Sequence, residues 1–248
     1  MKVALPNGKL AIIFIGTNKY LEFFPSYFNS CMNNLAPSSW VEKHFFVFSD
    51  GKVEGDLPDN ITFVPTEHKP WPAITLERFH TILTIEDRLK DFDWILFLDA
   101  DMEVRQRIES NELFTAKDFI GVHHPCHYLG MEPHNKAPGA FEVRQISRAG
   151  VKEDDLMDVY YQGCLWGGKL PHVLDMVKEL DSRTDEDHDK DIVAQWHDES
   201  HLNKFYIEHR DEVHTVSPSC AYPEVFASAC TFDPKIVHLA KDNSKYHV

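Results

Sequence analysis

Residues 94–101 read Trp-Ile-Leu-Phe-Leu-Asp-Ala-Asp. The five apolar residues 94–98 are typical of a strand that is buried on both faces of a parallel sheet. The acidic residues Asp99 and Asp101 follow directly, and in an open α/β sheet ligands gather at the carboxyl ends of the strands. Because residues i and i+2 of an extended segment point to the same side, we expect both carboxylates to face one ligand.

This acidic pair predicts a metal site. Two carboxylates with no soft ligand nearby suit Mn²⁺, or Mg²⁺ in its place, better than Zn²⁺. The ion would join Asp99 and Asp101 to a diphosphate and stabilise the negative charge on that group as it leaves. An Asp-x-Asp sequence also occurs by chance in acidic proteins, so a plain strand end is the alternative interpretation.

Three earlier segments have the same character as residues 94–98. Each is a short apolar, β-branched or aromatic run, and breaks such as Gly16 and Asp50-Gly51 follow them. Between residues 75 and 89, apolar side chains instead recur at helical spacing. Strands separated by helical stretches predict an α/β fold with a mostly parallel central sheet flanked by helices. The other predicted strands are residues 10–16, 44–49 and 61–64.

Two later segments predict loops. Residues 121–150 are rich in His, Pro and Gly, and we expect them to surround a site. Residues 181–191 (DSRTDEDHDKD) form a charged run, which predicts a solvated loop before the next helix. The chain shows no internal repeat and no flexible linker, and its 248 residues suit one large folded domain.

The composition limits the partners and the compartment. A net charge of −15 argues against nucleic acids and anionic membranes, whose phosphates bind clustered Lys and Arg. The five cysteines include no close pair, which favours reduced thiols and a cytoplasmic protein. No run approaches the roughly 20 apolar residues that span a bilayer. Residues 10–15 are also too short for a signal peptide and read as a buried strand.

Residues 196–205 read Trp-His-Asp-Glu-Ser-His-Leu-Asn-Lys-Phe. On a helix, His197 and His201 share one face, as in the H-E-x-x-H zinc proteases, although Asp198 stands where those enzymes have Glu. Asp198 and Glu199 would also suit the first turn of a helix for purely electrostatic reasons. A carboxylate that acts in glycosyl transfer is a third interpretation, and the residue types alone leave all three open.

Several segments together carry a family resemblance. They are Asp99-Ala100-Asp101-Met102-Glu103, residues 160–168 (YYQGCLWGG), residues 196–204 (WHDESHLNK) and Val216-Ser217-Pro218. In this order and over nearly the whole chain, they resemble the motifs of glycosyltransferase family 6. That family includes the histo-blood-group A and B transferases, the α1,3-galactosyltransferase and soluble bacterial relatives. Its bacterial members often have N-x-N in place of D-x-D, so the two aspartates here favour metal dependence.

The resemblance implies a fold and a set of roles. The fold would be a single GT-A domain over residues 1–248, with a nucleotide-binding half (1–103) and an acceptor-binding and catalytic half (104–248). Glu199 resembles the catalytic carboxylate, which also contacts the acceptor. His124 and Trp196 fall where the family binds the acceptor, and Asp99 and Asp101 where it binds the metal. The implied donor-binding residues are Ile15, Thr17, Tyr20, Arg78, Asp99, Ala100, Gln162, Gly163, Cys164, Asp198 and Lys241.

The implied activity is Mn²⁺-dependent transfer of a hexose from a UDP-sugar, with retention and in α1,3 linkage, to an oligosaccharide or other glycan acceptor. Gln162 and Cys164 are larger than the glycines of some relatives that accept N-acetylgalactosamine, which favours galactose. Glu199 would either attack the anomeric carbon or stabilise an oxocarbenium-like state. The rival interpretations are a zinc hydrolase that uses His197 and His201, and a carbohydrate-binding protein without catalysis.

Overall fold

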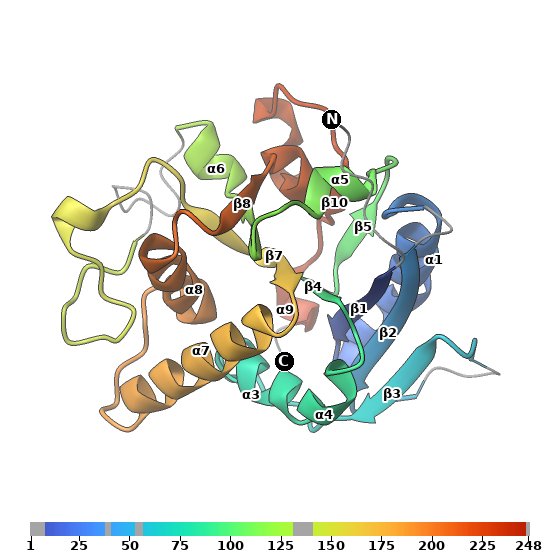
Figure 1. Ribbon diagram of the computed structural model, residues 1–248, viewed down its shortest axis with the longest axis horizontal. Coiled ribbons are helices and arrows are strands. Elements are labelled where there is room, and N and C mark those ends of the chain that lie inside the picture. Colours follow the sequence, from blue (N-terminus) through green and yellow to red (C-terminus); the bar gives the residue numbers. More distant parts are fainter. Residues whose placement is uncertain (1–7, 38–40, 53–56, 131–140, 247–248) are drawn as a thin grey trace.

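The apolar run 94–98 is strand β4 (Trp94–Leu98), and it lies at the centre of a seven-stranded sheet. The computed structural model describes residues 8–37, 41–52, 57–130 and 141–246. The strand order is β3-β2-β1-β4-β7-β6-β8 (Figure 1). The other strands are β1 (Gly8–Ile15), β2 (Val41–Ser49), β3 (Ile61–Pro65), β6 (Phe119–His123), β7 (Tyr161–Lys169) and β8 (Val213–Val216).

Most of this sheet is parallel, as predicted. β1 runs parallel to β2 and β4, β2 to β3, and β6 to β8, whereas β7 is antiparallel to both β4 and β6. The carboxyl ends of β1 and β4 therefore meet the amino end of β7 at one edge. There Leu98 pairs with Leu165, and the amide of Asp99 donates to the carbonyl of Cys164 at 2.9 Å. This edge carries the site.

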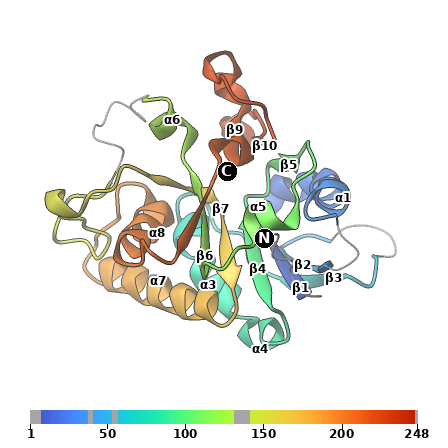
Figure 2. The same cartoon turned by 45° about the horizontal axis from the view of Figure 1, so that its top comes forward.

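Helices cover both faces of the sheet. Along β1, Leu10, Ile12 and Phe14 pack with the buried face of α1, while Ala11 and Ile13 join the core beneath the helices of the other face. Figures 1 and 2 show α1 on one side and α3, α7 and α8 on the other. Among the described residues the α-helices are α1 (Phe24–Asn34), α2 (Ala73–Leu76), α3 (Arg78–Leu83), α4 (Glu86–Leu89), α5 (Ser110–Leu113), α6 (Pro125–Tyr128), α7 (His172–His188), α8 (His197–Glu208) and α9 (Asn243–Tyr246).

A small second sheet brings the C-terminal part of the chain to the site. It consists of β5 (Met102–Val104), β10 (Ile236–His238) and β9 (Tyr222–Pro223). β10 pairs antiparallel with β5, so that His238 lies opposite Met102, the residue after Asp101. The predicted boundary between the two halves of the domain, at residues 103 and 104, falls inside β5. That division stays a prediction.

Three predictions about the elements need correction. The helical stretch 75–89 consists of three short helices, because Glu77 and Ile85 leave helical backbone geometry. The segment 121–150 is not all loop, since β6 extends to His123 and α6 follows. Residues 131–140 lie outside the described part. The charged run 181–191 was wrongly expected to be a loop: α7 continues to His188, because it buries one face through Leu180, Thr184 and Asp187.

Candidate active site

A pocket of about 270 Å³ opens where β1 and β4 end. Its walls come from the ends of these strands, from the segment that leads into α3, and from the chain after β10. This position agrees with the rule that α/β sheets bind ligands at the carboxyl ends of their strands. Eight of the predicted site residues line the pocket: Ile15, Thr17, Tyr20, Arg78, Asp99, Ala100, Asp101 and Lys241.

Arg78 connects the pocket to the first turn of α8. Its guanidinium lies 3.3 Å from Asp99 Oδ1 and 3.0 Å from Asp198 Oδ2, and Nη1 donates to the carbonyl of Gly163 at 3.0 Å. Burial of the arginine would lower its pKa, but the two carboxylates outweigh that effect and raise it. Burial raises the pKa of Asp198 to about 6, although Arg78 opposes the rise. Arg78 thus connects the end of β4, the strand β7 and the first turn of α8.

Glu199 is fixed by two hydrogen bonds. The amide of Gly163 donates to Oε2 at 2.7 Å, and the hydroxyl of Tyr160 donates to Oε1 at 2.8 Å. Burial nevertheless raises the pKa of Glu199 to about 7, with smaller contributions from the charges of Asp198 and Asp99. A β-carbon at Gly163 would lie 3.3 Å from that of Glu199, so a glycine allows this close approach.

Other residues of the segment 196–204 fix the position of α8. Asn203 accepts from the amide of Tyr161 at 2.8 Å and donates to its carbonyl at 2.7 Å, which docks α8 on β7. His197, the first residue of the helix, has a φ of 51°, in the left-handed region. Asp198 and Glu199 lie in the first turn, where the helix dipole favours negative charge. His197 and His201 therefore do lie on one helix, which runs from His197 to Glu208.

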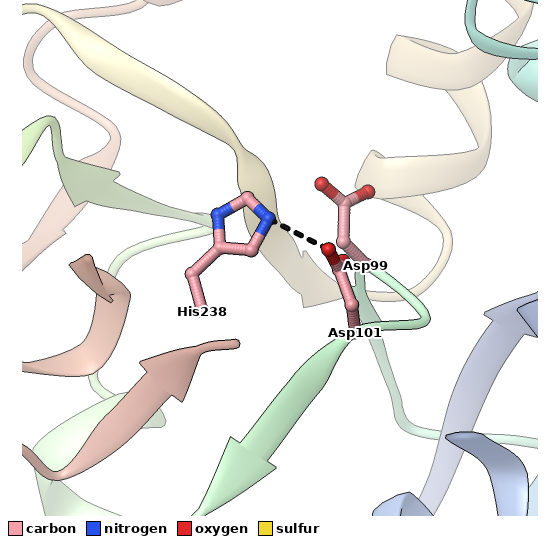
Figure 3. Close-up of side chains that lie close together, drawn as sticks. All are labelled: Asp99, Asp101 and His238. Atoms are coloured by element: carbon pink, nitrogen blue, oxygen red, sulfur yellow. Dashed lines mark hydrogen bonds and ion pairs between the residues drawn. The ribbon is translucent and has the colours of Figure 1, made fainter. Parts of the chain in front are cut away.

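Asp99 and Asp101 lie beside a third candidate metal ligand, His238 (Figure 3). One ligand atom of each lies within 4.8 Å of the others, and within the described ranges this is the one such group of His, Cys, Asp or Glu side chains. Burial and Asp101 raise the pKa of Asp99 against the effect of Arg78. Burial would also raise the pKa of Asp101, but His238 and Lys241 lower it. Two carboxylates and an imidazole are a donor set that fits a divalent ion such as Mn²⁺.

His124 and Trp196, which were predicted to bind the acceptor, do not line the pocket. His124 caps α6 by accepting from the amide of Cys126 at 3.1 Å, and its ring centroid lies 5.8 Å from that of Tyr160. Tyr160 in turn donates to Glu199. Trp196 precedes α8, and its amide donates to the hydroxyl of Ser200 at 2.9 Å. His124 is thus connected to Glu199 through Tyr160, and Trp196 is connected directly, because its carbonyl accepts from the amide of Glu199 at 3.0 Å.

Gln162 and Cys164 flank Gly163 on β7 but do not line the pocket. Cys164 is 2% exposed and packs in the core. Burial, and after it the charges of Asp99 and Glu199, raise the pKa of its thiol well above the usual value. The Cys164 thiol therefore lies within electrostatic range of these carboxylates. Because the side chain is buried, any effect on a bound sugar would come through the residues that line the pocket.

His197 and His201, the two histidines of the zinc-hydrolase interpretation, lie in different surroundings. The ring of His197 meets that of Trp71 edge to face at 4.9 Å. His201 is fully buried, with Nε2 3.6 Å from Asp187 Oδ2, and burial lowers its pKa to about 4. Neither belongs to the metal-ligand group in the described part of the chain. The structure therefore gives the hydrolase interpretation no support.

Sequence reasoning missed several pocket residues. His68 is bonded to the hydroxyl of Thr17 through Nδ1 at 2.8 Å, and the ring of Tyr246 packs edge to face on Tyr20 at 5.3 Å. Trp71 and His238 also line the pocket. Of these residues, only His238 could have been noticed in the sequence, as a histidine three residues before the predicted Lys241. Its place beside Asp101 becomes clear only from the register of β10 against β5.

Two bulk predictions can be compared with the structure. All five cysteines are free thiols, as the absence of close pairs led us to expect. Over the residues that the structure places, no helix has the length and apolar character needed to cross a membrane. The cytoplasmic location stays a prediction.

The mostly parallel seven-stranded sheet with helices on both faces has the architecture of a GT-A fold. Residues 12–246 match the profile of glycosyltransferase family 6, and the chain belongs to this family. As a member it uses a nucleotide-sugar donor and a glycan acceptor.

Similar proteins come from bacteria and animals. The O-antigen biosynthesis glycosyltransferase WbnI of Escherichia coli is 26% identical over 95% of this chain and 96% of its own length. The mouse globoside alpha-1,3-N-acetylgalactosaminyltransferase 1 is 29% identical over 82% of this chain and 58% of its own. Rat histo-blood group ABO system transferase 2 is 25% identical over 83% and 61%. The chain thus spans nearly all of the bacterial relative and about three-fifths of these animal ones.

Proposed function

We propose that the protein is a retaining, Mn²⁺-dependent transferase that moves galactose, or N-acetylgalactosamine with lower efficiency, from a UDP-sugar onto a glycan in α1,3 linkage. The family supports the reaction type, and the mouse relative is named as an alpha-1,3-N-acetylgalactosaminyltransferase. The E. coli relative is named for O-antigen biosynthesis, so an O-antigen glycan is the acceptor class to test first.

The observation that carries the proposal is the set of contacts made by Arg78. It joins Asp99, on the metal side of the pocket, to Asp198 and to the carbonyl of Gly163. The amide of Gly163 in turn binds Glu199. A donor whose diphosphate lies beside Asp99 would therefore bring its sugar to Arg78, Asp198 and Glu199. We assign the uridine to Ile15, Thr17 and Tyr20, at the end of β1.

The charges of the site suit departure of UDP. Asp99 and Asp101 would hold the metal ion, which supplies positive charge to the leaving diphosphate. Lys241, whose Nζ lies 5.4 Å from the centre of the Tyr20 ring, adds a second cation at the same wall of the pocket. Such charges act strongly in a site from which water is excluded.

Glu199 acts at the anomeric carbon in one of two ways. As a nucleophile, a carboxylate oxygen of Glu199 attacks this carbon, and the bond to the phosphate oxygen breaks. The acceptor oxygen then displaces Glu199 and gives its proton to an oxygen of the cleaved UDP. In the alternative, the acceptor attacks on the face that UDP leaves, and the departing phosphate takes the acceptor proton. Mass spectrometry of the protein after reaction with donor alone separates the two, since only the first leaves a hexose on Glu199.

The choice of donor sugar rests on Gln162 and Cys164. Larger side chains at these positions leave less room for an acetamido group at C2, which favours galactose. A steric difference of this kind is worth about 1–3 kcal/mol, so some transfer of the other sugar is expected. In a competition at equal concentrations, we expect the galactosyl product in excess, and we expect Cys164→Gly to shift the ratio toward N-acetylgalactosamine. An excess of acetamido product from the unaltered protein would contradict the assignment.

One assay tests the proposed function. The protein is incubated with UDP-galactose, Mn²⁺ and a panel of glycans, and both UDP release and the linkage of the product are measured. We expect an α1,3-linked product that disappears with EDTA and returns with Mn²⁺. A carbohydrate-binding protein would retain the glycan without releasing UDP, and full turnover in EDTA would contradict the role of the metal.

A further inference from the structure

A second cavity, of about 260 Å³, lies between α2, α3, α7 and the segment that leads into α8. We propose that this cavity, here called the α7 cavity, is a binding site for a small aliphatic diamine. The residues that carry the proposal are Asp181 and Asp185 on α7 and His201 on α8, all of which line it. The proposal does not depend on the proposed transferase activity.

The short helix α2 separates the α7 cavity from the pocket at the ends of β1 and β4. Ile74 and Thr75 line that pocket, whereas Ala73 and Leu76 line the α7 cavity. The two share no lining residue among those that the structure describes. The α7 cavity is therefore a separate site, on the other side of α2.

His201 gives the α7 cavity a buried polar group without a partner. Its side chain is fully buried, and neither ring nitrogen makes a hydrogen bond with a residue that the structure describes. Oδ2 of Asp187 lies 3.6 Å from Nε2 and already accepts from the hydroxyl of Ser147. Burial keeps the imidazole neutral at neutral pH, so one of its nitrogens is an acceptor. Because buried polar groups are nearly always hydrogen-bonded, we expect a donor in the cavity.

The α7 cavity carries negative charge. Asp181 and Asp185 lie one turn apart on α7, a spacing at which like charges repel. Burial, and after it the charge of Asp185, raise the pKa of Asp181. His80 Nδ1 is 3.7 Å from Asp181 Oδ2, and it carries a charge only when protonated. Among the described residues that line the cavity, none is Lys or Arg. A cationic ligand would offset this charge.

The arrangement suits an extended organic cation better than a metal ion. In the part of the chain that the structure describes, the only three His, Cys, Asp or Glu side chains whose ligand atoms come close enough to share one ion lie elsewhere. The acids of the α7 cavity therefore do not converge on one point, and Leu76, Ile192 and Val193 add apolar surface to its walls. A diamine offers ammonium donors for the carboxylates and for His201, and methylene groups for the apolar walls.

Isothermal titration of the full chain with 1,4-diaminobutane at physiological salt tests the proposal. We expect saturable binding of one diamine per chain. Butane-1,4-diol has the same length without the charge and should bind at least about tenfold more weakly, because hydrogen bonds to charged groups are the stronger ones. Binding that saturating UDP with Mn²⁺ abolishes would place the diamine in the other pocket and overturn the proposal. A cavity that holds only water would give no saturable heat, which also overturns it.

Variants on α7 distinguish the site from general attraction to an acidic protein. Asp185 is exposed, so Asp185→Asn should fold normally and bind the diamine about threefold to fivefold more weakly. The matched control is Glu186→Gln, which makes the same change of charge on the next residue. Glu186 pairs with Arg148 at 3.1 Å and does not line the cavity, so this variant should bind as the wild type does. Equal losses in the two variants would reduce the binding to the net charge of −15 and contradict a site.

The imidazole signals in nitrogen NMR spectra locate the diamine. The signals of His201, identified by their absence in His201→Phe, should shift when 1,4-diaminobutane is added. Those of His44 should stay in place, because His44 is bonded to Thr62 and lies outside the cavity. Diamine binding that leaves the His201 signals unmoved would refute the assignment. If His201→Phe fails to fold, the comparison of Asp185→Asn with Glu186→Gln still decides it.

Discussion

Glu199 is a carboxylate whose surroundings partly oppose its charge. Burial favours the neutral acid, while the amide of Gly163 and the hydroxyl of Tyr160 favour the anion, and the outcome is a pKa of about 7. Changing Glu199 to Gln keeps the size of the side chain and removes the negative charge. We expect kcat to fall by about 10² or more while UDP binding survives, because the lost interaction is made in the transition state. Near-normal turnover in steady-state assays would show that the carboxylate is structural.

The pKa of Glu199 also predicts the pH dependence of the reaction. Either mechanism needs the anion, so kcat should rise with pH through a midpoint near 7 and fall about tenfold for each unit well below it. In Tyr160→Phe the anion loses a hydrogen bond, so the pKa of Glu199 should rise and the midpoint should move to higher pH. Rate profiles from pH 5.5 to 9 measure both. A flat profile, or one that moves to lower pH in the variant, is the result that contradicts this assignment.

At the scale of elements, the sequence predicted correctly the features that neighbouring residues determine, and it missed those that depend on distant segments. The strand 94–98 was predicted to the residue, because every residue of it is apolar and acidic residues follow. α7 was mistaken for a loop at residues 181–191, because the buried Asp187 does not look like a core position. The role of His238 is set by the pairing of β10 with β5, between segments more than 130 residues apart. Long-range register of this kind leaves no trace in a single sequence.

α8 also carries a pH-sensitive contribution to stability through His201. Burial depresses the pKa of this histidine from 6.5 to about 4, so between these pH values the unfolded chain binds a proton that the folded protein does not. Stability should therefore fall as the pH drops through 6.5, by about 2 kcal/mol from this residue between pH 7 and pH 5.

Urea unfolding at pH 7 and pH 5 measures this contribution. Other groups also titrate in this range, so the comparison is with His201→Asn, which should lose less stability on acidification than the wild type even if it is less stable at both pH values. Equal losses in the two proteins would show that His201 exchanges no proton on unfolding in this range.

At the scale of the whole molecule, the pocket depends on segments from both ends of the chain. Ile15, Thr17 and Tyr20 come from the end of β1 and the turn after it, and Lys241 and Tyr246 from the last residues that the structure describes. The rings of Tyr20 and Tyr246 pack together across this wall. The unfolded chain has no such pocket, so a ligand of this pocket binds only the folded protein. Its binding free energy therefore adds to the stability of the whole domain.

We expect the stabilisation by a bound nucleotide to depend on metal, because the protein carries a net charge of −15. UDP is an anion, and Asp99 and Asp101 line the pocket it would enter, so UDP alone meets repulsion that a divalent ion removes. At 100 times the dissociation constant, UDP with Mn²⁺ should stabilise the protein by about 2.7 kcal/mol, which raises Tm by about 5–10 °C in a chain of this size. UDP with EDTA at the same concentration should raise it by far less. Asp101→Asn should lose the metal-dependent part of the shift, because it removes a metal ligand. Equal shifts with and without Mn²⁺ in thermal melts would show that the basic side chains, Arg78 and Lys241, hold the nucleotide by themselves.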